Sequence, residues 1–144
     1  VLVNPDEDVL EQLKDLPFDY YQIYDSKPSY VKKIKEKYNK KIISVVMVSN
    51  KNDVDNYKDY ENISDMILFD SKGYHKSESF NHGYLDKVIT KLPIMIAGDI
   101  KVDDLDNFKN KKFCIDISGG LETGGIKDIN KIDKFLNSVH NISS

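Results

Sequence analysis

A strict alternation of apolar and polar runs is the feature that most constrains the fold of this chain. Short apolar runs, most of them rich in β-branched residues, predict six strands, at 1–5, 19–24, 41–49, 66–70, 93–98 and 111–118. Helices are predicted after each of them, at 6–15, where Asp6 can cap the helix, and at 29–38, 50–60, 84–91, 102–109 and 129–139. Six strand–helix units in strict alternation require a parallel sheet, which is either closed into a barrel or open and doubly wound, as in flavodoxin-like folds.

The composition excludes several classes of function. The chain has 144 residues, of which 40% are hydrophobic and 31% charged, as expected for one soluble globular domain over 1–144. No apolar run approaches the length of a membrane span, and the net charge of −3 is spread over interspersed acids and lysines. We therefore expect neither a membrane nor a nucleic acid as partner. A single cysteine is typical of a reducing compartment, which predicts a cytoplasmic protein.

The glycines gather near the end of the chain. Four of the seven, Gly119, Gly120, Gly124 and Gly125, follow the last predicted strand within seven residues. Glycine allows backbone N–H groups to approach an anion, and a strand, a glycine-rich loop and a helix commonly bind phosphate together. The chain has no arginine, so a phosphate would be held by backbone amides, helix ends or lysine. A tight turn that needs positive φ is the alternative interpretation.

The carboxyl ends of the predicted strands carry the residues that could take part in catalysis or binding. These residues are Tyr24, Asp70, Gly98, Asp116 and Ser118. In a barrel of parallel strands they would all face one mouth, where such enzymes have their active sites. The predicted loop at 71–83 is long and polar, which is typical of a functional loop.

Five segments resemble motifs of phosphoribosylanthranilate isomerase, a (β/α)8-barrel enzyme of tryptophan biosynthesis. VLVNP (1–5) is similar to the family's F-V-N-P, DYYQIY (19–24) to its Q-L-H-G, ILFDS (67–71) to L-L-D-S and IMIAGDI (94–100) to L-A-G-G-L. The most specific similarity joins IDISGGLETGGIKD (115–128) to V-D-V-S-S-G-V-E…P-G-x-K-D. The segments occur in the family's order and match the chain to its third to eighth βα units.

The resemblance implies an α/β fold of the TIM-barrel type that is incomplete in this chain, because the first two βα units have no counterpart. The segments 1–5 and 111–118 would then flank a gap and would not pair with each other. The family's general base is a cysteine in its first strand, in the motif K-I-C-G. Cys114 lies in the last predicted strand and cannot be its equivalent, so we expect it to be a small core residue. The 144-residue chain alone is expected to be inactive.

The reaction that the resemblance implies is an Amadori rearrangement, without cofactor or metal. It converts N-(5-phosphoribosyl)anthranilate into 1-(2-carboxyphenylamino)-1-deoxyribulose 5-phosphate and needs an acid, a base and a grip on the phosphate. Asp70 matches the general acid, a role in which burial at an apolar strand end would help it to hold a proton. Asp116 and Gln22 match substrate-binding residues. The matched phosphate-binding residues are Ala97, Gly98, Asp99, Ser118, Gly119 and Gly120.

Each of these assignments has a structural alternative. Asp70 could cap the following loop, Asp116 could be a core acid paired with a lysine, and Gln22 could satisfy local backbone groups. Three further residues match family letters but are expected to fix the loop and cap the last helix, namely Glu122, Lys127 and Asp128. The histidines lie in polar contexts without metal-like spacing and are expected to be exposed, namely His75, His82 and His140.

The chain also departs from the family pattern. Tyr24-Asp25 stands where His-Gly is usual, Ser44 where lysine is frequent, and 74–77 where the family has the flexible G-G-T-G. Asp99 replaces a glycine and puts a carboxylate near the expected phosphate, which is unfavourable unless it points away. Two further hypotheses therefore remain: a divergent barrel with another sugar-phosphate substrate, and a degenerate barrel without catalysis. A monomer or a homodimer is expected in each case.

Overall fold

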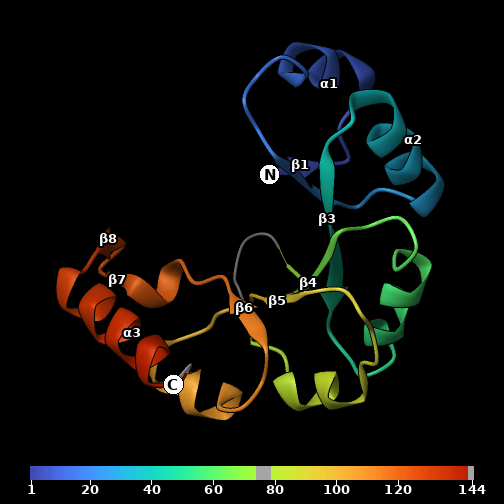
Figure 1. Cartoon of the computed structure of the whole chain (residues 1–144). Coiled ribbons are helices and arrows are strands. Elements are labelled where there is room, and N and C mark those ends of the chain that lie inside the picture. Colours follow the sequence, from blue (N-terminus) through green and yellow to red (C-terminus); the bar gives the residue numbers. More distant parts are fainter. Residues whose placement is uncertain (74–78, 143–144) are drawn as a thin grey trace.

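The computed structural model describes residues 1–73 and 79–142, and its main element is a six-stranded parallel sheet (Figure 1). The strands lie in the sheet in the order in which they occur in the chain. They are β1 (Leu2–Val3), β2 (Tyr20–Tyr24), β3 (Lys41–Val48), β4 (Met66–Ser71), β5 (Ile94–Ile96) and β6 (Phe113–Ile115). All six predicted strands are confirmed, although several are shorter than predicted.

The strand order decides between the two sheet topologies. A doubly wound sheet contains a point at which the strand order reverses. No reversal occurs between β1 and β6, so the open, flavodoxin-like alternative is wrong. Right-handed crossovers that always advance in one direction put their helices on the same face of the sheet, as in the wall of a (β/α) barrel.

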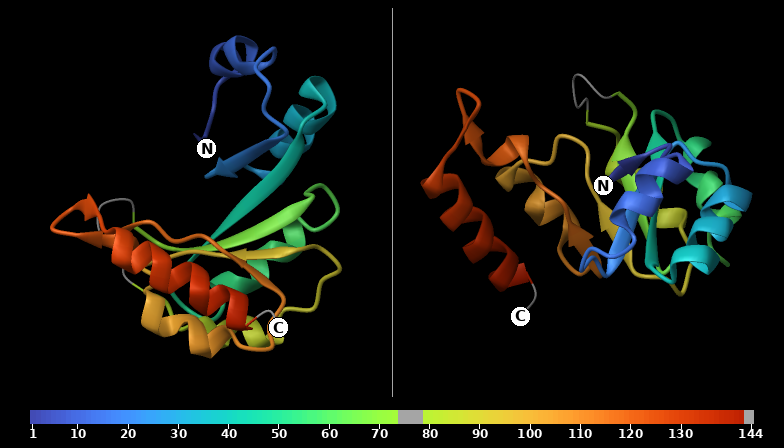
Figure 2. Two further views of the ribbon diagram at one scale, coloured as in Figure 1. Left: turned by 60° about the vertical axis from the view of Figure 1, so that its left-hand side comes forward. Right: turned by 90° about the horizontal axis from the view of Figure 1, so that it is seen from above.

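The two ends of the sheet are β1 and β6. Among the described residues β1 pairs only with β2, and β6 pairs only with β5. The two strands lie apart in the molecule (Figures 1 and 2). The segments 1–5 and 111–118 therefore do not pair with each other, as predicted.

The connections between the strands differ in helix type. Two are α-helices, α1 (Glu7–Leu13) and α2 (Pro28–Tyr38), and a third α-helix, α3 (Ile129–Ile142), follows the last strand of the chain. Three segments predicted as ordinary helices are 3₁₀ turns, η1 (Asp53–Asp59), η2 (His82–Lys87) and η3 (Val102–Phe108). Of these, η1 and η3 are rich in Asp and Asn, whose side chains compete for backbone hydrogen bonds and so favour short, tight turns. The last helix, α3, packs beside η3 (Figure 2).

A short hairpin before α3 was not expected from the sequence. After the single turn η4 (Gly119–Leu121), strands β7 (Glu122–Thr123) and β8 (Ile126–Lys127) pair antiparallel. Gly124 and Gly125 connect them with φ of +60° and +77°, the left-handed conformation that a two-residue type I′ turn requires. The interpretation as a tight turn therefore holds for the second pair of glycines in the cluster, Gly124 and Gly125.

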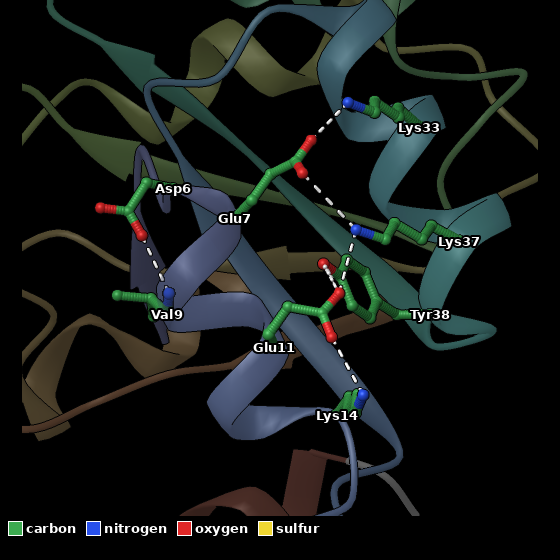
Figure 3. Close-up of polar contacts among 8 residues, drawn as sticks. All are labelled: Asp6, Glu7, Val9, Glu11, Lys14, Lys33, Lys37 and Tyr38. Atoms are coloured by element: carbon green, nitrogen blue, oxygen red, sulfur yellow. Dashed lines mark hydrogen bonds and ion pairs between the residues drawn. The ribbon is translucent and has the colours of Figure 1, made fainter.

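Charged side chains join α1 to α2 (Figure 3). Asp6 caps α1 as predicted, because its carboxylate accepts a hydrogen bond from the Val9 N–H at 2.8 Å. Glu7 pairs with Lys33 and Lys37 of α2, and Glu11 also pairs with Lys37, at 2.9 Å. The lysine-rich face of α2 is thus partly held against the first helix of the chain.

The two faces of the sheet have different neighbours. One packs against the helical segments, in apolar clusters that include Phe69 with Phe108 and Ile42 with Leu10. The opposite face is lined by side chains from the strands, among them Val45 and Leu68, and by Ala97 directly after β5. Cys114 pairs in register with Met95, which lies on this second face, and it is exposed. The prediction of a buried Cys114 is wrong, because β6 is an edge strand and no described strand covers it.

Candidate functional site

A cavity of about 160 Å³ lies at the carboxyl ends of β4, β5 and β6. All the predicted site residues except Gln22 line it. Its lining consists of Asp70, Ala97, Gly98, Asp99, Ile100, Asp116, Ser118, Gly119 and Gly120. The fold thus brings together two acids and two glycine-containing loops that lie far apart in the sequence, because parallel strands end at the same edge of the sheet.

The glycines of the two loops have different physical roles. Gly98 has a φ of +92°, and a Cβ there would lie 2.8 Å from the Ser71 nitrogen. A Cβ on Gly120 would lie 2.1 Å from the carbonyl oxygen of Ile100, so this position admits only glycine. A Cβ on Gly119 would have no atom within 4 Å. Gly98 and Gly120 allow the loops to pack closely, whereas Gly119 borders open space.

Asp99, the carboxylate next to the expected phosphate site, has a lysine partner. Its Oδ2 lies 3.5 Å from Nζ of Lys101, and its backbone adopts a φ of +48°. The positive charge of Lys101 offsets part of the repulsion that this carboxylate would exert on an anion.

Both carboxylate oxygens of Asp70 accept hydrogen bonds. The Ser71 N–H donates to Oδ1 at 2.8 Å, which is the loop-capping contact considered as an alternative. The Tyr24 hydroxyl donates to Oδ2 at 2.9 Å, and Nε2 of Gln22 lies 3.4 Å from the same hydroxyl. Burial and the Asp70 charge raise the pKa of Tyr24 well above its usual value, so its hydroxyl keeps its proton. Gln22 therefore reaches the site through Tyr24.

Asp116 is the second acid of the cavity. Burial by the surrounding protein raises the pKa of its carboxyl, and the negative charge of Asp70 raises it further. No lysine forms an ion pair with Asp116 in the described part of the chain, so the interpretation as a lysine-paired core acid is not supported. The protonated form of Asp116 is therefore favoured over that of an exposed aspartate.

Asp70 also lines a second cavity, of about 240 Å³. Its lining is Val1, Val3, Tyr24, Met47, Asp70, Ser71 and Gly73. Tyr24 and Met47 were not among the predicted binding residues. The position at a strand end had already singled out Tyr24 in the sequence, although without a binding role. Met47 stands near the end of its predicted strand, so the same signal could have identified it.

Comparison with known proteins decides the family. Residues 1–138 match the family model described as N-(5'phosphoribosyl)anthranilate (PRA) isomerase. The chain belongs to this family.

Curated relatives and solved structures agree with this assignment. The N-(5'-phosphoribosyl)anthranilate isomerase of Clostridium acetobutylicum is 32% identical over 153 residues, covering 94% of this chain and 69% of the relative. That of Staphylococcus aureus strain MRSA252 is 27% identical and covers 96% and 70%. The phosphoribosyl anthranilate isomerase of Thermus thermophilus superposes with a TM-score of 0.77 at 15% identity, covering 98% of this chain and 71% of that one.

The Thermotoga maritima phosphoribosyl anthranilate isomerase gives a TM-score of 0.76 at 22% identity and covers 97% and 71% of the two chains. At this level of identity the superpositions show the fold alone, which is α/β of the TIM-barrel type. A further structure with a TM-score of 0.72 is a phosphoribosyl anthranilate isomerase in complex with reduced 1-(o-carboxyphenylamino)-1-deoxyribulose 5-phosphate.

The loop that carries the PRA isomerase motif at 115–128 is fixed by its own charged residues. Nζ of Lys127 donates to the carbonyl and hydroxyl oxygens of Ser118 at 3.0 and 3.1 Å and pairs with Glu122 at 2.6 Å. Asp128 accepts hydrogen bonds from the backbone N–H groups of Asn130 and Lys131, at the start of α3. The expected structural roles of Glu122, Lys127 and Asp128 are confirmed.

His82 is a correction to the sequence analysis, because it was expected to be exposed. Its ring packs against Phe80 and Phe108, with centroids 4.6 and 5.1 Å away, and its buried Nε2 has no partner within the described ranges. Burial lowers the pKa of His82, and a hydrogen bond with the Ala97 backbone acts in the opposite direction. Phe80 lies two residues before His82, but only the tertiary packing brings Phe108 of η3 against the ring. His140 is exposed as expected, and His75 lies outside the described residues.

Other site types find no support in the part of the chain that the structure describes. Its His, Cys, Asp and Glu side chains form no group that could hold a metal ion. None of the helices described is both long and apolar enough to cross a membrane.

Proposed function

We propose that this chain belongs to an enzyme of tryptophan biosynthesis that isomerises N-(5-phosphoribosyl)anthranilate to 1-(2-carboxyphenylamino)-1-deoxyribulose 5-phosphate. The observation that carries the proposal is the position of Asp70 between two cavities of different chemistry. One has the glycine loops, which suit a phosphate, and the other has Val3, Tyr24 and Met47, which suit an aromatic ring. The substrate has the same order, with a ribose between its phosphate and its anthranilate ring.

The proposed roles follow from this arrangement. Backbone N–H groups of 97–99 and 118–120 hold the phosphate, and Asp70 gives a proton to the ring oxygen of the ribose as the ring opens. The base that removes the C2′ proton is expected from the family's first strand, which has no counterpart among β1 to β6. The resulting enol becomes the ketone, so no atom is gained or lost. Asp116 lies near the anthranilate nitrogen, and Gln22 acts on the site through Tyr24.

We also propose that residues 1–144 form six of the eight βα units of one barrel domain. Two observations support this: the edge strands β1 and β6 do not pair with each other, and the chain spans about 70% of the length of its first relatives. The intact mass of the protein isolated from its source tests it. A mass several kilodaltons above the 16.6 kDa of this chain is expected, whereas full activity of a 16.6 kDa protein would overturn the proposal.

The substitution Asp70→Asn tests the proposed chemistry in the full-length protein. Loss of a general acid lowers the turnover number by about 10²- to 10⁴-fold, and the Michaelis constant should change little. The measurement is the rate of conversion of N-(5-phosphoribosyl)anthranilate. Asp55→Asn is the matched control, because Asp55 is an exposed acid of η1 that only pairs with Lys58; it should leave the rate unchanged.

The same assay separates the competing hypotheses. A degenerate barrel would leave both variants with the same negligible rate as the unsubstituted protein. A barrel with another sugar-phosphate substrate would bind inorganic phosphate but would not turn over this substrate or be inhibited by its reduced product. We expect the protein to be cytoplasmic and a monomer or a homodimer, without a nucleic-acid or membrane partner.

A further inference from the structure

We infer that Tyr24 is a positioning residue for Asp70, holding its carboxyl group at the junction of the two cavities. The inference rests on the proposed role of Asp70 as the acid. Tyr24 ends β2 and Asp70 lies in β4, so the hydrogen bond of 2.9 Å between them spans the intervening strand β3. Neighbouring strands are about 4.8 Å apart, so a donor two strands away needs a long side chain to reach the carboxylate.

The contacts around Asp70 leave its carboxyl group little freedom. One oxygen accepts the Ser71 N–H at 2.8 Å and the other accepts the Tyr24 hydroxyl. A rotation of the carboxyl group would break both hydrogen bonds. A carboxyl oxygen has two lone pairs, so Oδ2 can accept from Tyr24 and still carry a proton toward the substrate.

The surroundings of Tyr24 direct its hydroxyl proton to Asp70. The hydroxyl oxygen faces the donor Nε2 of Gln22 at 3.4 Å, which leaves the tyrosine proton free to point at the acceptor Asp70. The phenol is half-buried among strand side chains, which stabilises its neutral, donating form. The charge of the nearby Asp116 carboxyl also favours the neutral form of Tyr24. The same ring lines the second cavity, so one side chain forms the wall and orients the acid.

The substitution Tyr24→Phe removes the hydroxyl and keeps the ring. In the full-length protein we expect the turnover number to fall about tenfold or more, because the hydrogen bond strengthens as Asp70 gives up its proton and becomes charged. The Michaelis constant should be nearly unchanged. Tyr60→Phe is the matched control, since the Tyr60 hydroxyl is similarly buried but donates to the Ser26 carbonyl, at 2.8 Å. It should leave the turnover number unchanged.

A double-mutant cycle separates positioning from a general structural effect. If Tyr24 acts through Asp70, Tyr24→Phe should have no further effect in the Asp70→Asn background. Equal losses in both backgrounds would mean that the hydroxyl does not act through Asp70 and would overturn the inference. A Tyr24→Phe variant with unchanged turnover would also overturn the inference. The proposed function would still stand in that case, provided that Asp70→Asn is inactive. If Asp70→Asn is fully active, the acid role itself fails.

Discussion

Gly119 and Gly120 are adjacent in the sequence, yet the structure assigns them opposite tolerances to substitution. A methyl group at Gly120 would meet the Ile100 carbonyl oxygen at 2.1 Å, and a backbone atom cannot move away as a flexible side chain can. A methyl group at Gly119 would meet no atom within 4 Å. Packing therefore requires glycine at position 120, whereas only a ligand would require it at position 119.

Gly120→Ala is therefore expected to destabilise the protein by about 1–3 kcal/mol, the range typical of overpacking. Gly119→Ala is the matched control and should unfold at the same urea concentration as the unsubstituted protein. If the proposed phosphate site is right, Gly119→Ala should instead weaken the binding of inorganic phosphate. Urea unfolding and phosphate titration measure the two effects, and equal stability losses in both variants would contradict the loop geometry.

At the scale of elements, α1 and α2 share an apolar cluster and are also joined by ion pairs, and the contribution of the ion pairs should depend on pH. Hydrogen bonds from Lys37, Lys14 and Tyr38 lower the pKa of Glu11 from 4.5 to about 2. A lowered pKa in the folded state means that the ionised carboxylate stabilises the fold. This contribution is present above the unfolded-state pKa and is lost as the pH falls from about 4.5 to about 2.

We therefore expect Glu11→Gln to lower the melting temperature slightly near neutral pH and to have no effect in acid. The effect should be small and should shrink in high salt, because the partners are exposed to solvent. Thermal melts followed by circular dichroism at several pH values and two salt concentrations measure it. Glu36→Gln is a suitable control, since Glu36 only approaches Lys32 within α2, at 3.9 Å. A loss that persists in acid would contradict the argument.

At the scale of the whole molecule, the edges of the sheet determine behaviour in solution. Among the described strands β1 and β6 each have only one neighbour, so each leaves unpaired backbone N–H and C=O groups. Open strand edges are templates for pairing with another chain. The 144 residues expressed by themselves should therefore associate in a concentration-dependent way.

The substitution Val3→Lys should reduce this association, because a charge on an edge strand opposes strand pairing. Val3 is 53% exposed in β1. Ile89→Lys adds the same charge at a side chain that is 85% exposed and belongs to no strand, and it should have no effect. Sedimentation velocity at several concentrations measures the association. A monomer at all concentrations would contradict the role of the open edges.

Much of the fold was predictable because its determinants are local. The apolar runs identified all six strands, and Asp6 signalled the start of the first helix through its capping side chain. The carboxyl-end positions of Asp70 and Asp116 followed from parallel strands, and the family motifs added the two loops that line the same cavity. The chemical roles of these residues remain predictions.

The errors concern residues whose environment is set by distant parts of the chain. Cys114 sits in an apolar run but lies on an uncovered edge strand, and His82 sits in a polar run but packs between Phe80 and Phe108. Neither outcome can be inferred from the local pattern, because the exposure of Cys114 depends on which strands pair with β6, and Phe108 reaches His82 from η3.

The sequence by itself therefore determined the alternation of strands and helices, the parallel sheet and the residues at the strand ends. Local hydrophobic periodicity and hydrogen bonding within short segments encode these features. Only the tertiary structure decided the unreversed strand order, the face on which each side chain lies and the contact between Tyr24 and Asp70. That contact joins residues 46 positions apart across an intervening strand, so it exists only once the sheet has brought the two strands into place.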